Sequence, residues 1–142
     1  MSGAKILLMD LDRDALTAVF TRYPVVAAYL FGSQATGQTS PLSDVDIAVI
    51  LEPGLASPGT VQAQLISDLM LVLRRSDVDV VVLNTAPPLL KERAISRGRL
   101  LYCRDEIARV RFEVAARREY FETQALRDLH DRALLDRYTG DD

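Results

Sequence analysis

Three acidic residues and a Gly-Ser pair mark where this chain of 142 residues could do chemistry. Asp44 and Asp46 open a segment that is otherwise apolar through Leu51, and they alternate with Val45. Alternate residues of a strand project from the same face, so the two carboxylates would lie close together. Asp is disfavoured in strands, and two such charges repel unless a cation lies between them. The pattern predicts a magnesium site, because magnesium is held by carboxylates together with substrate phosphates. The alternative interpretation makes both residues exposed caps in the turn before a strand.

A third carboxylate, Asp79, lies inside the apolar run of residues 78–83. A carboxylate inside a strand is expected to face the core or a cleft and to need a partner. If this strand lies beside that of Asp46, Asp79 completes an acidic cluster, as a metal ligand and as the group that takes a proton from an attacking hydroxyl. The alternative is an edge-strand Asp paired with an arginine. Asp77 is a competing candidate, but its place next to Ser76 is more typical of a solvated turn residue.

The Gly-Ser pair, Gly32-Ser33, follows the apolar run of residues 25–31 and opens a polar loop. In such a loop, backbone amides and a hydroxyl can meet phosphate oxygens, and glycine lets them come close. Ten residues separate this pair from Asp44. The spacing brings a phosphate-binding turn and a metal site to neighbouring strand ends, which indicates that both serve one reaction.

The periodicity of apolar residues predicts alternating helices and strands. It gives helices over 12–22, 61–73, 87–97 and 105–137, the last with room for one break, and strands over 25–31, 44–51, 78–83 and 100–102. The expected fold class is α/β (α+β), a small mixed β-sheet flanked by helices. We expect a single domain over residues 1–142, with a core of about 10–103 and a C-terminal helical segment of about 104–139.

The C-terminal segment is rich in charge, with eight basic and ten acidic residues after residue 103. Its expected helix carries one apolar stripe, and Asp105/Arg109, Glu113/Arg117 and Asp128/Arg132 are spaced as i,i+4 pairs. The stripe consists of Ile107, Val110, Val114 and Phe121. One interpretation is a solvated helix that packs on the core through this stripe. The other is a docking helix for another protein.

Composition excludes several classes of function. The formal net charge of -3 gives no general attraction to polyanions, so direct nucleic-acid binding is not expected. Cys103 is the only cysteine, which excludes an internal disulfide and a cysteine-based zinc site. No apolar run is long enough to cross a membrane and no export signal is visible, so cytoplasmic localisation is expected. The single histidine, His130, is assigned no role.

Taken together, these motifs resemble the minimal nucleotidyltransferases of the DNA polymerase beta-like superfamily. The signature of that family is Gly-Ser, about ten residues, then Asp-x-Asp. The match runs from Phe31-Gly32-Ser33 to Asp44-Val45-Asp46 and continues with Asp79 and the Leu83–Pro87 turn. One departure is visible, because Thr36 stands where these proteins often have arginine. The departure bears on triphosphate binding and leaves the metal chemistry untouched.

The resemblance implies a polymerase beta-like fold and transfer of a nucleoside monophosphate from a triphosphate, ATP, to a hydroxyl. Asp44 and Asp46 would hold two Mg²⁺ ions, and Asp79 would assist with one and activate the acceptor. Gly32 and Ser33 would bind the triphosphate. The chemistry would be two-metal transfer, in which the protein mostly positions charge.

Small stand-alone members, the MntA-like antitoxins, are encoded with a HEPN-domain ribonuclease toxin and silence it by adenylylating a tyrosine. The resemblance therefore implies a magnesium-dependent protein adenylyltransferase that acts as an antitoxin and binds a HEPN toxin as a hetero-oligomer. Two alternatives stay open. One is transfer to a small hydroxylated molecule such as an aminoglycoside, and the other is a non-catalytic module that only covers the toxin.

Overall fold

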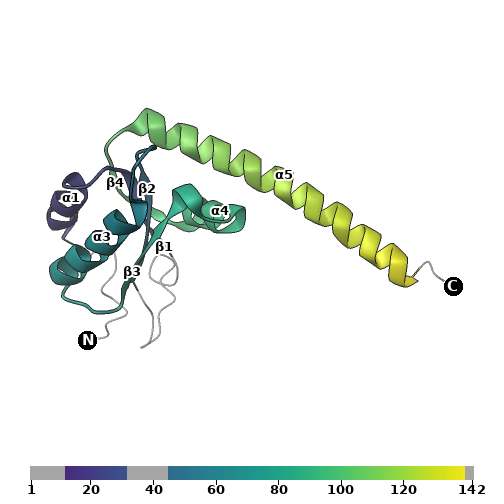
Figure 1. Cartoon of the computed structure of the whole chain (residues 1–142), viewed down its shortest axis with the longest axis horizontal. Coiled ribbons are helices and arrows are strands. Elements are labelled where there is room, and N and C mark those ends of the chain that lie inside the picture. Colours follow the sequence, from purple (N-terminus) through teal and green to yellow (C-terminus); the bar gives the residue numbers. More distant parts are fainter. Residues whose placement is uncertain (1–11, 32–44, 140–142) are drawn as a thin grey trace.

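The computed structural model describes residues 12–31 and 45–139 (Figure 1). Among the described residues, helices and strands occur in the order that the sequence predicted, and the short 3₁₀ helix η2 is added to them. Their bounds are α1 Arg13–Thr21, β1 Val25–Phe31, β2 Val45–Leu51, α3 Pro58–Leu73, β3 Val78–Val82, η2 Leu83–Thr85, α4 Pro88–Arg97, β4 Arg99–Cys103 and α5 Glu106–Thr139.

Within the described residues the strands form one four-stranded sheet in the order β3-β2-β1-β4. Strand β1 pairs antiparallel with both β2 and β4, whereas β2 and β3 are parallel. A parallel pair needs a crossover connection, and α3 supplies it between β2 and β3. The predicted mixed sheet flanked by helices is confirmed.

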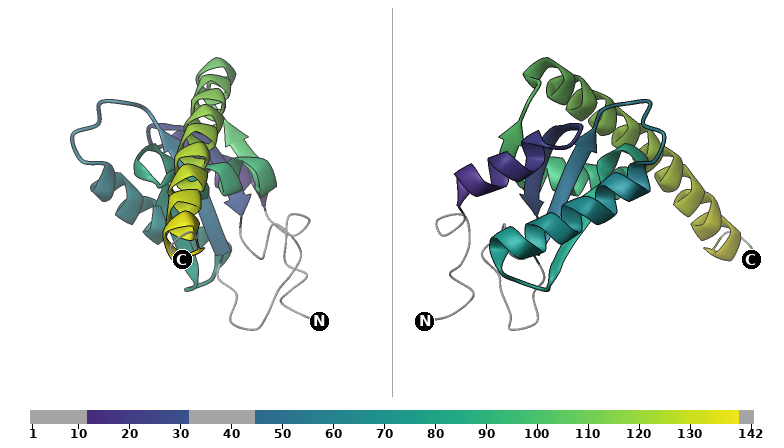
Figure 2. Two further views of the ribbon diagram at one scale, coloured as in Figure 1. Left: turned by 90° about the vertical axis from the view of Figure 1, so that its right-hand side faces the viewer. Right: turned by 60° about the vertical axis from the view of Figure 1, so that its left-hand side comes forward.

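Helices cover both faces of this sheet, as the two views in Figure 2 show. Strand residues alternate between the faces, so each face has its own core cluster. One cluster joins α1 and α3 to residues such as Val45, Ile47 and Val80. The other joins α4 and the first part of α5 to residues such as Tyr29 and Ala48. Both faces of β1 and β2 are therefore buried, which explains their nearly continuous apolar sequences.

The helix ends follow from local chemistry. Asp12 caps α1, where its Oδ1 accepts a hydrogen bond of 3.1 Å from the Ala15 amide. Helix α3 begins at Pro58, three residues before the predicted start, because proline lacks only an N–H that the first turn would not use. It ends at Arg74, which takes a left-handed conformation with φ 55°.

The segment after β3 differs from its prediction, because Leu83 leaves the strand and starts η2. The Asn84 side chain accounts for this early end. Its Oδ1 accepts from the Leu51 N–H and its Nδ2 donates to the Leu51 carbonyl, both at 2.9 Å. The Asn84 side chain thus makes, at the end of β2, the hydrogen bonds that a further backbone pair of β3 would make.

The last helix agrees with the prediction in its length and differs from it in its packing. It is a single unbroken helix of 34 residues, and its predicted packing stripe faces solvent. The four stripe residues, Ile107, Val110, Val114 and Phe121, are 44% to 67% exposed. Instead Ala108, Phe112 and Ala116 face the domain, because two small alanines let the helix backbone approach closely.

A polar anchor joins α5 to the sheet. The Tyr29 hydroxyl donates to Glu113 Oε2 at 2.6 Å, and Arg109 Nη1 donates to the same oxygen at 2.8 Å. Burial and the bond to Glu113 raise the pKa of the Tyr29 hydroxyl, which therefore stays a neutral donor. Arg109 also pairs with Glu106. Its predicted partner, Asp105, instead accepts from the Ala108 amide at the start of the helix.

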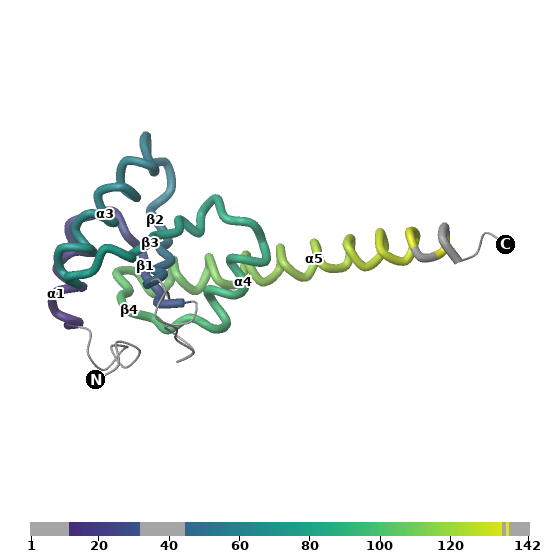
Figure 3. Tube along the Cα trace, turned by 90° about the horizontal axis from the view of Figure 1, so that it is seen from below, coloured from purple at the N-terminus to yellow at the C-terminus, as the bar shows by residue number. Residues whose placement is uncertain are grey.

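The distal part of α5 projects from the body, as Figure 3 shows from below. A salt bridge of 3.0 Å between Lys91 and Glu119 joins the helix to α4. Beyond this point, the side chains that the structure describes from Ala125 to Asp136 are exposed, apart from a half-buried Leu134. None of the described helices has the length and apolar character needed to cross a membrane.

Gly98 provides a test of how tightly α4 is joined to β4. A Cβ at this position would lie 2.2 Å from the Ala94 carbonyl oxygen and 3.2 Å from that of Leu30. We expect Gly98→Ala to lower the free energy of unfolding by about 2 kcal/mol, because backbone must move. Gly59→Ala is the matched control, since nothing lies within 4 Å of its added Cβ. Equal urea midpoints for the two variants would contradict this account.

Candidate functional site

One row of residues crosses three neighbouring strands. Phe31 is the register partner of Asp46, and Asp46 is the register partner of Asp79. Neighbouring strands lie about 4.8 Å apart, and residues in register project from the same face. The predicted adjacency of the two acidic strands is therefore confirmed, and two of the three predicted acids lie side by side.

The other predicted site residues, Gly32, Ser33 and Asp44, lie outside the described residues. Thr36, at the position of the departure from the family pattern, lies outside them as well. Along the sequence, Gly32 directly follows Phe31, and Asp44 directly precedes the first residue of β2. The roles of these residues stay predictions.

The face of the sheet that carries the two acids follows from their neighbours. Val45 and Ile47 flank Asp46 and belong to the cluster under α1 and α3. Val78 and Val80, which flank Asp79, belong to that same cluster. Because strand residues alternate, both carboxylates project on the opposite face, which α4 and α5 cover. Asp46 is half-buried there.

Asp79 is exposed rather than buried. Its Oδ1 accepts a hydrogen bond of 2.9 Å from the Val80 amide, which holds the side chain on the outer side of β3. Among the described residues β3 lies at an edge of the sheet. The alternative interpretation was therefore right about the edge, although the hydrogen bond of Asp79 is to a backbone amide and not to an arginine.

Asp77, the competing candidate, is held by Arg75. Nε and Nη2 of Arg75 donate to the two carboxylate oxygens at 2.7 and 2.6 Å. This pairing lowers the pKa of the Asp77 carboxyl below its ordinary value. The Asp77 carbonyl also accepts from the Val45 amide at 2.8 Å. Asp77 thus fixes the start of β2 against the loop before β3, which is a structural role.

The donor set of this row suits a hard divalent cation. Asp46 and Asp79 bring two carboxylates to one face, and magnesium prefers such oxygen ligands. The described residues contain no group of three His, Cys, Asp or Glu side chains that could hold a metal ion. A magnesium site would therefore combine Asp46 and Asp79 with Asp44, the third acid that the sequence predicts.

A cavity of about 290 Å³ adjoins Asp79 at the outer side of β3. It lies between β3, the helix α3 and the start of α4, with Gln62 among its lining residues. Gln62 Nε2 donates to the Val80 carbonyl at 2.7 Å. The sequence analysis missed Gln62, because only the packing of α3 against β3 brings it to the site. Cavities that Glu52 and Pro53 line lie at the opposite end of β2.

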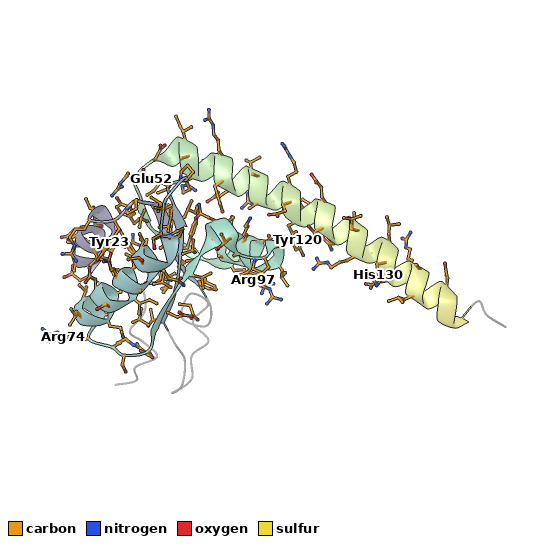
Figure 4. All side chains as sticks on the ribbon, in the orientation of Figure 1. Tyr23, Glu52, Arg74, Arg97, Tyr120 and His130 are labelled. Carbon is orange, nitrogen blue, oxygen red and sulfur yellow. The ribbon has the colours of Figure 1, made fainter. Side chains whose placement is uncertain are left out.

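Several residues with reactive or charged side chains lie away from this row. His130 is on the projecting part of α5, and Arg74 lies at the far end of α3 (Figure 4). Cys103 is a half-buried free thiol at the end of β4.

A family model described as "Polymerase beta, Nucleotidyltransferase" matches residues 14–107. This match spans the sheet and its helices up to the start of α5. No curated protein sequence matches the chain.

Solved structures of toxin-antitoxin complexes share this fold. A toxin-antitoxin complex with AMP-PNP contains a chain that is 25% identical, with a TM-score of 0.72 over 88% of this chain and 99% of that one. A mutant of the MntA-HpeT toxin-antitoxin gives 25% identity and a TM-score of 0.69 over 88% and 98%. A complex of tri-AMPylated Shewanella oneidensis HEPN toxin with MNT antitoxin contains a chain that is 23% identical, with a TM-score of 0.66 over 87% of this chain and 95% of that one. At this identity the similarity is one of fold.

The Asp77 pairing makes stability depend on pH in a defined direction. Its pKa is lower in the folded chain, so the pairing stabilises at neutral pH and its contribution is lost as pH falls through the folded pKa. We expect Asp77→Asn to lower the free energy of unfolding at pH 7. The difference in free energy of unfolding between the variant and the unchanged chain should shrink below about pH 4. Urea unfolding at several pH values measures this, with Asp131→Asn on the exposed α5 as control. A gap that stays constant with pH would contradict the pairing.

Proposed function

The chain belongs to the polymerase beta family of nucleotidyltransferases, and we propose from this premise that it transfers AMP from ATP to a tyrosine hydroxyl of a HEPN-family toxin and so acts as its antitoxin. The observation that carries the enzymatic part is the register of Asp46 with Asp79 on one face of the sheet. Two carboxylates on register-paired residues of neighbouring strands suit a nucleotide-bound divalent ion.

Each site residue has a distinct role in this proposal. Asp44 and Asp46 hold Mg²⁺, and Asp79 shares one ion and faces the acceptor. Gly32 and Ser33 bind the triphosphate. The support is the strand order, since Phe31, the residue before the Gly-Ser pair, is in register with Asp46. The nucleotide and the acceptor would thus meet across β2, from the β1 side and the β3 side.

The reaction balances as a single displacement. The tyrosine oxygen forms a bond to the α-phosphorus of ATP, the bond from that phosphorus to the bridging oxygen breaks, and pyrophosphate leaves. The phenolic proton passes to the Asp79 carboxylate. Bound Mg²⁺ would supply charge neutralisation at the attacking and leaving oxygens. The protein's own contribution is to hold both reactants in line across the row of strands.

The partner is inferred from the relatives and from α5. Chains 25% identical to this one were crystallised as toxin-antitoxin, one of them with AMP-PNP. The structural match covers 88% of this chain. Because residues 1–119 make up a smaller part of the chain than that, the match extends into the projecting part of α5. The projecting part presents exposed leucines, Leu126 and Leu129, and an exposed apolar helix face is typical of a protein-binding surface. We therefore assign the projecting helix to the toxin interface.

Replacing either acid of the row tests the chemistry. We expect Asp46→Asn and Asp79→Asn each to reduce AMP transfer at least about 100-fold, because the charges that hold and orient the reactants are lost. The assay follows label from α-labelled ATP into a purified HEPN-family toxin, with magnesium present. Asp14→Asn, an exposed change in α1, is the matched control. Full neutralisation of the toxin by both inactive variants would favour the non-catalytic alternative.

The exposed leucines of α5 test the interface. Leu126 and Leu129 are 67% and 62% exposed on the projecting part. We expect the double change Leu126→Ser and Leu129→Ser to weaken toxin binding at least about tenfold, since it removes the apolar area that binding would bury. Titration calorimetry with the toxin measures it. Leu71→Ser, a similarly exposed leucine on α3, is the control, and equal affinities for both variants would exclude this surface.

A further inference from the structure

The cavity beside Asp79 is built from three elements at the outer side of β3. Its volume is about 290 Å³. It is lined by Gln62 of α3, by residues 79–82 of β3, and by Thr85, Ala86, Pro87 and Leu90 around the start of α4. It adjoins a cavity at the opposite end of β2, with which it shares Val82 and Thr85, but Asp79 does not line that second cavity.

The position of the cavity relative to the sheet indicates that it receives the acceptor. Among the described residues the strand order runs β1, β2, β3, and the cavity adjoins Asp79 on the edge strand. In the proposed function, the nucleotide enters from the β1 side and the acid row lies across β2. A second reactant in line with these groups must therefore come from the β3 side. Among the described residues, this cavity provides an opening on that side.

The edge of β3 also determines how a protein could enter. The Val80 amide donates to Asp79 Oδ1, and the Val80 carbonyl accepts from Gln62 Nε2. Both backbone groups of Val80 are therefore occupied by side chains of this chain. An incoming segment cannot add a strand at this position, so it has to insert a side chain instead.

The lining indicates which side chain fits. Pro87, Ala86 and Leu90 give one apolar wall in an open cavity whose lining surface is more polar than apolar, and Asp79 is the only charged residue among the lining residues. A phenol has an apolar ring and one polar tip, which matches this wall and a single carboxylate. A polycationic aminoglycoside would need several acidic partners.

We propose that this cavity binds the phenol ring of the acceptor tyrosine, with the ring against Leu90 and Pro87 and the hydroxyl toward Asp79. The inference rests on the proposed function and adds to it the site that selects the acceptor. Gln62 acts here as a positioning residue, because its bond to Val80 fixes the strand edge next to Asp79.

Filling the cavity tests the proposal. Leu90→Trp and Thr85→Trp each place a large ring in it from a different element, so a folding defect in one does not decide the outcome. We expect both to raise the KM for the HEPN-family acceptor at least about tenfold, with unchanged binding of AMP-PNP. Leu89→Trp is the matched control, since Leu89 is the neighbouring exposed leucine and does not line the cavity.

A binding measurement gives a second readout. We expect N-acetyl-tyrosinamide to shift the amide resonances of Val81, Thr85 and Leu90 in the full chain, and Leu90→Trp to abolish these shifts. Kanamycin should leave them unchanged. Shifts with kanamycin alone would overturn the assignment to tyrosine.

The enzymatic proposal and the cavity can fail separately. If both filled variants transfer AMP with the normal KM while Asp46→Asn is inactive, the cavity is not the acceptor site and the enzymatic proposal stands. If Asp46→Asn is as active as the unchanged chain, the enzymatic proposal fails and the cavity assignment fails with it.

Discussion

The register of β2 between β1 and β3 is the constraint on which the site depends. A shift of one residue on either side would move Asp46 to the other face of the sheet, among the apolar side chains under α1 and α3. The buried residues that alternate with the acids, Val45, Ile47, Val78 and Val80, oppose such a shift. The core therefore fixes the distance between two charges that repel each other, because the free energy of burying several valine and isoleucine side chains exceeds that repulsion.

The two faces of the sheet have different roles, since one contains most of the apolar core and the other carries the acidic residues. Helices α1 and α3 close the face that contains most of the apolar core, and α3 also makes the parallel pairing of β2 with β3 possible. Helices α4 and α5 close the face that carries the acids, and they leave space at the outer side of β3. The anchor from Tyr29 to Glu113 and Arg109 holds only the first part of α5. The distal part stays exposed, which is the geometry expected of a helix that binds a second protein.

Much of the fold followed from local patterns, and the errors have a common cause. Continuous apolar runs and the breaks at Pro24, Pro53 and Gly98 located the strands and helix ends. The sequence left open whether the stripe on α5 packs on the core or binds another protein, because an isolated helix gives no sign of which apolar face a sheet will accept. The structure uses Ala108 and Ala116 instead, since small residues permit closer packing. Of the candidate site, the adjacency of the strands that carry Asp46 and Asp79 was predictable, but Gln62 carried no signal, because it comes near Asp79 only through the packing of α3.

By itself the sequence determined the chemistry available to this protein, namely an Asp-x-Asp pair, a third Asp in a strand and a Gly-Ser pair at a fixed spacing, because residue types and local periodicity are properties of neighbouring positions. Tertiary structure alone decided that Asp46 and Asp79 lie in register, that Asp79 is on an edge strand of the described sheet and that a cavity opens beside it. Those features depend on strand order and on contacts between residues far apart in the chain. Such contacts are chosen by the packing of the whole core, and no single segment encodes them.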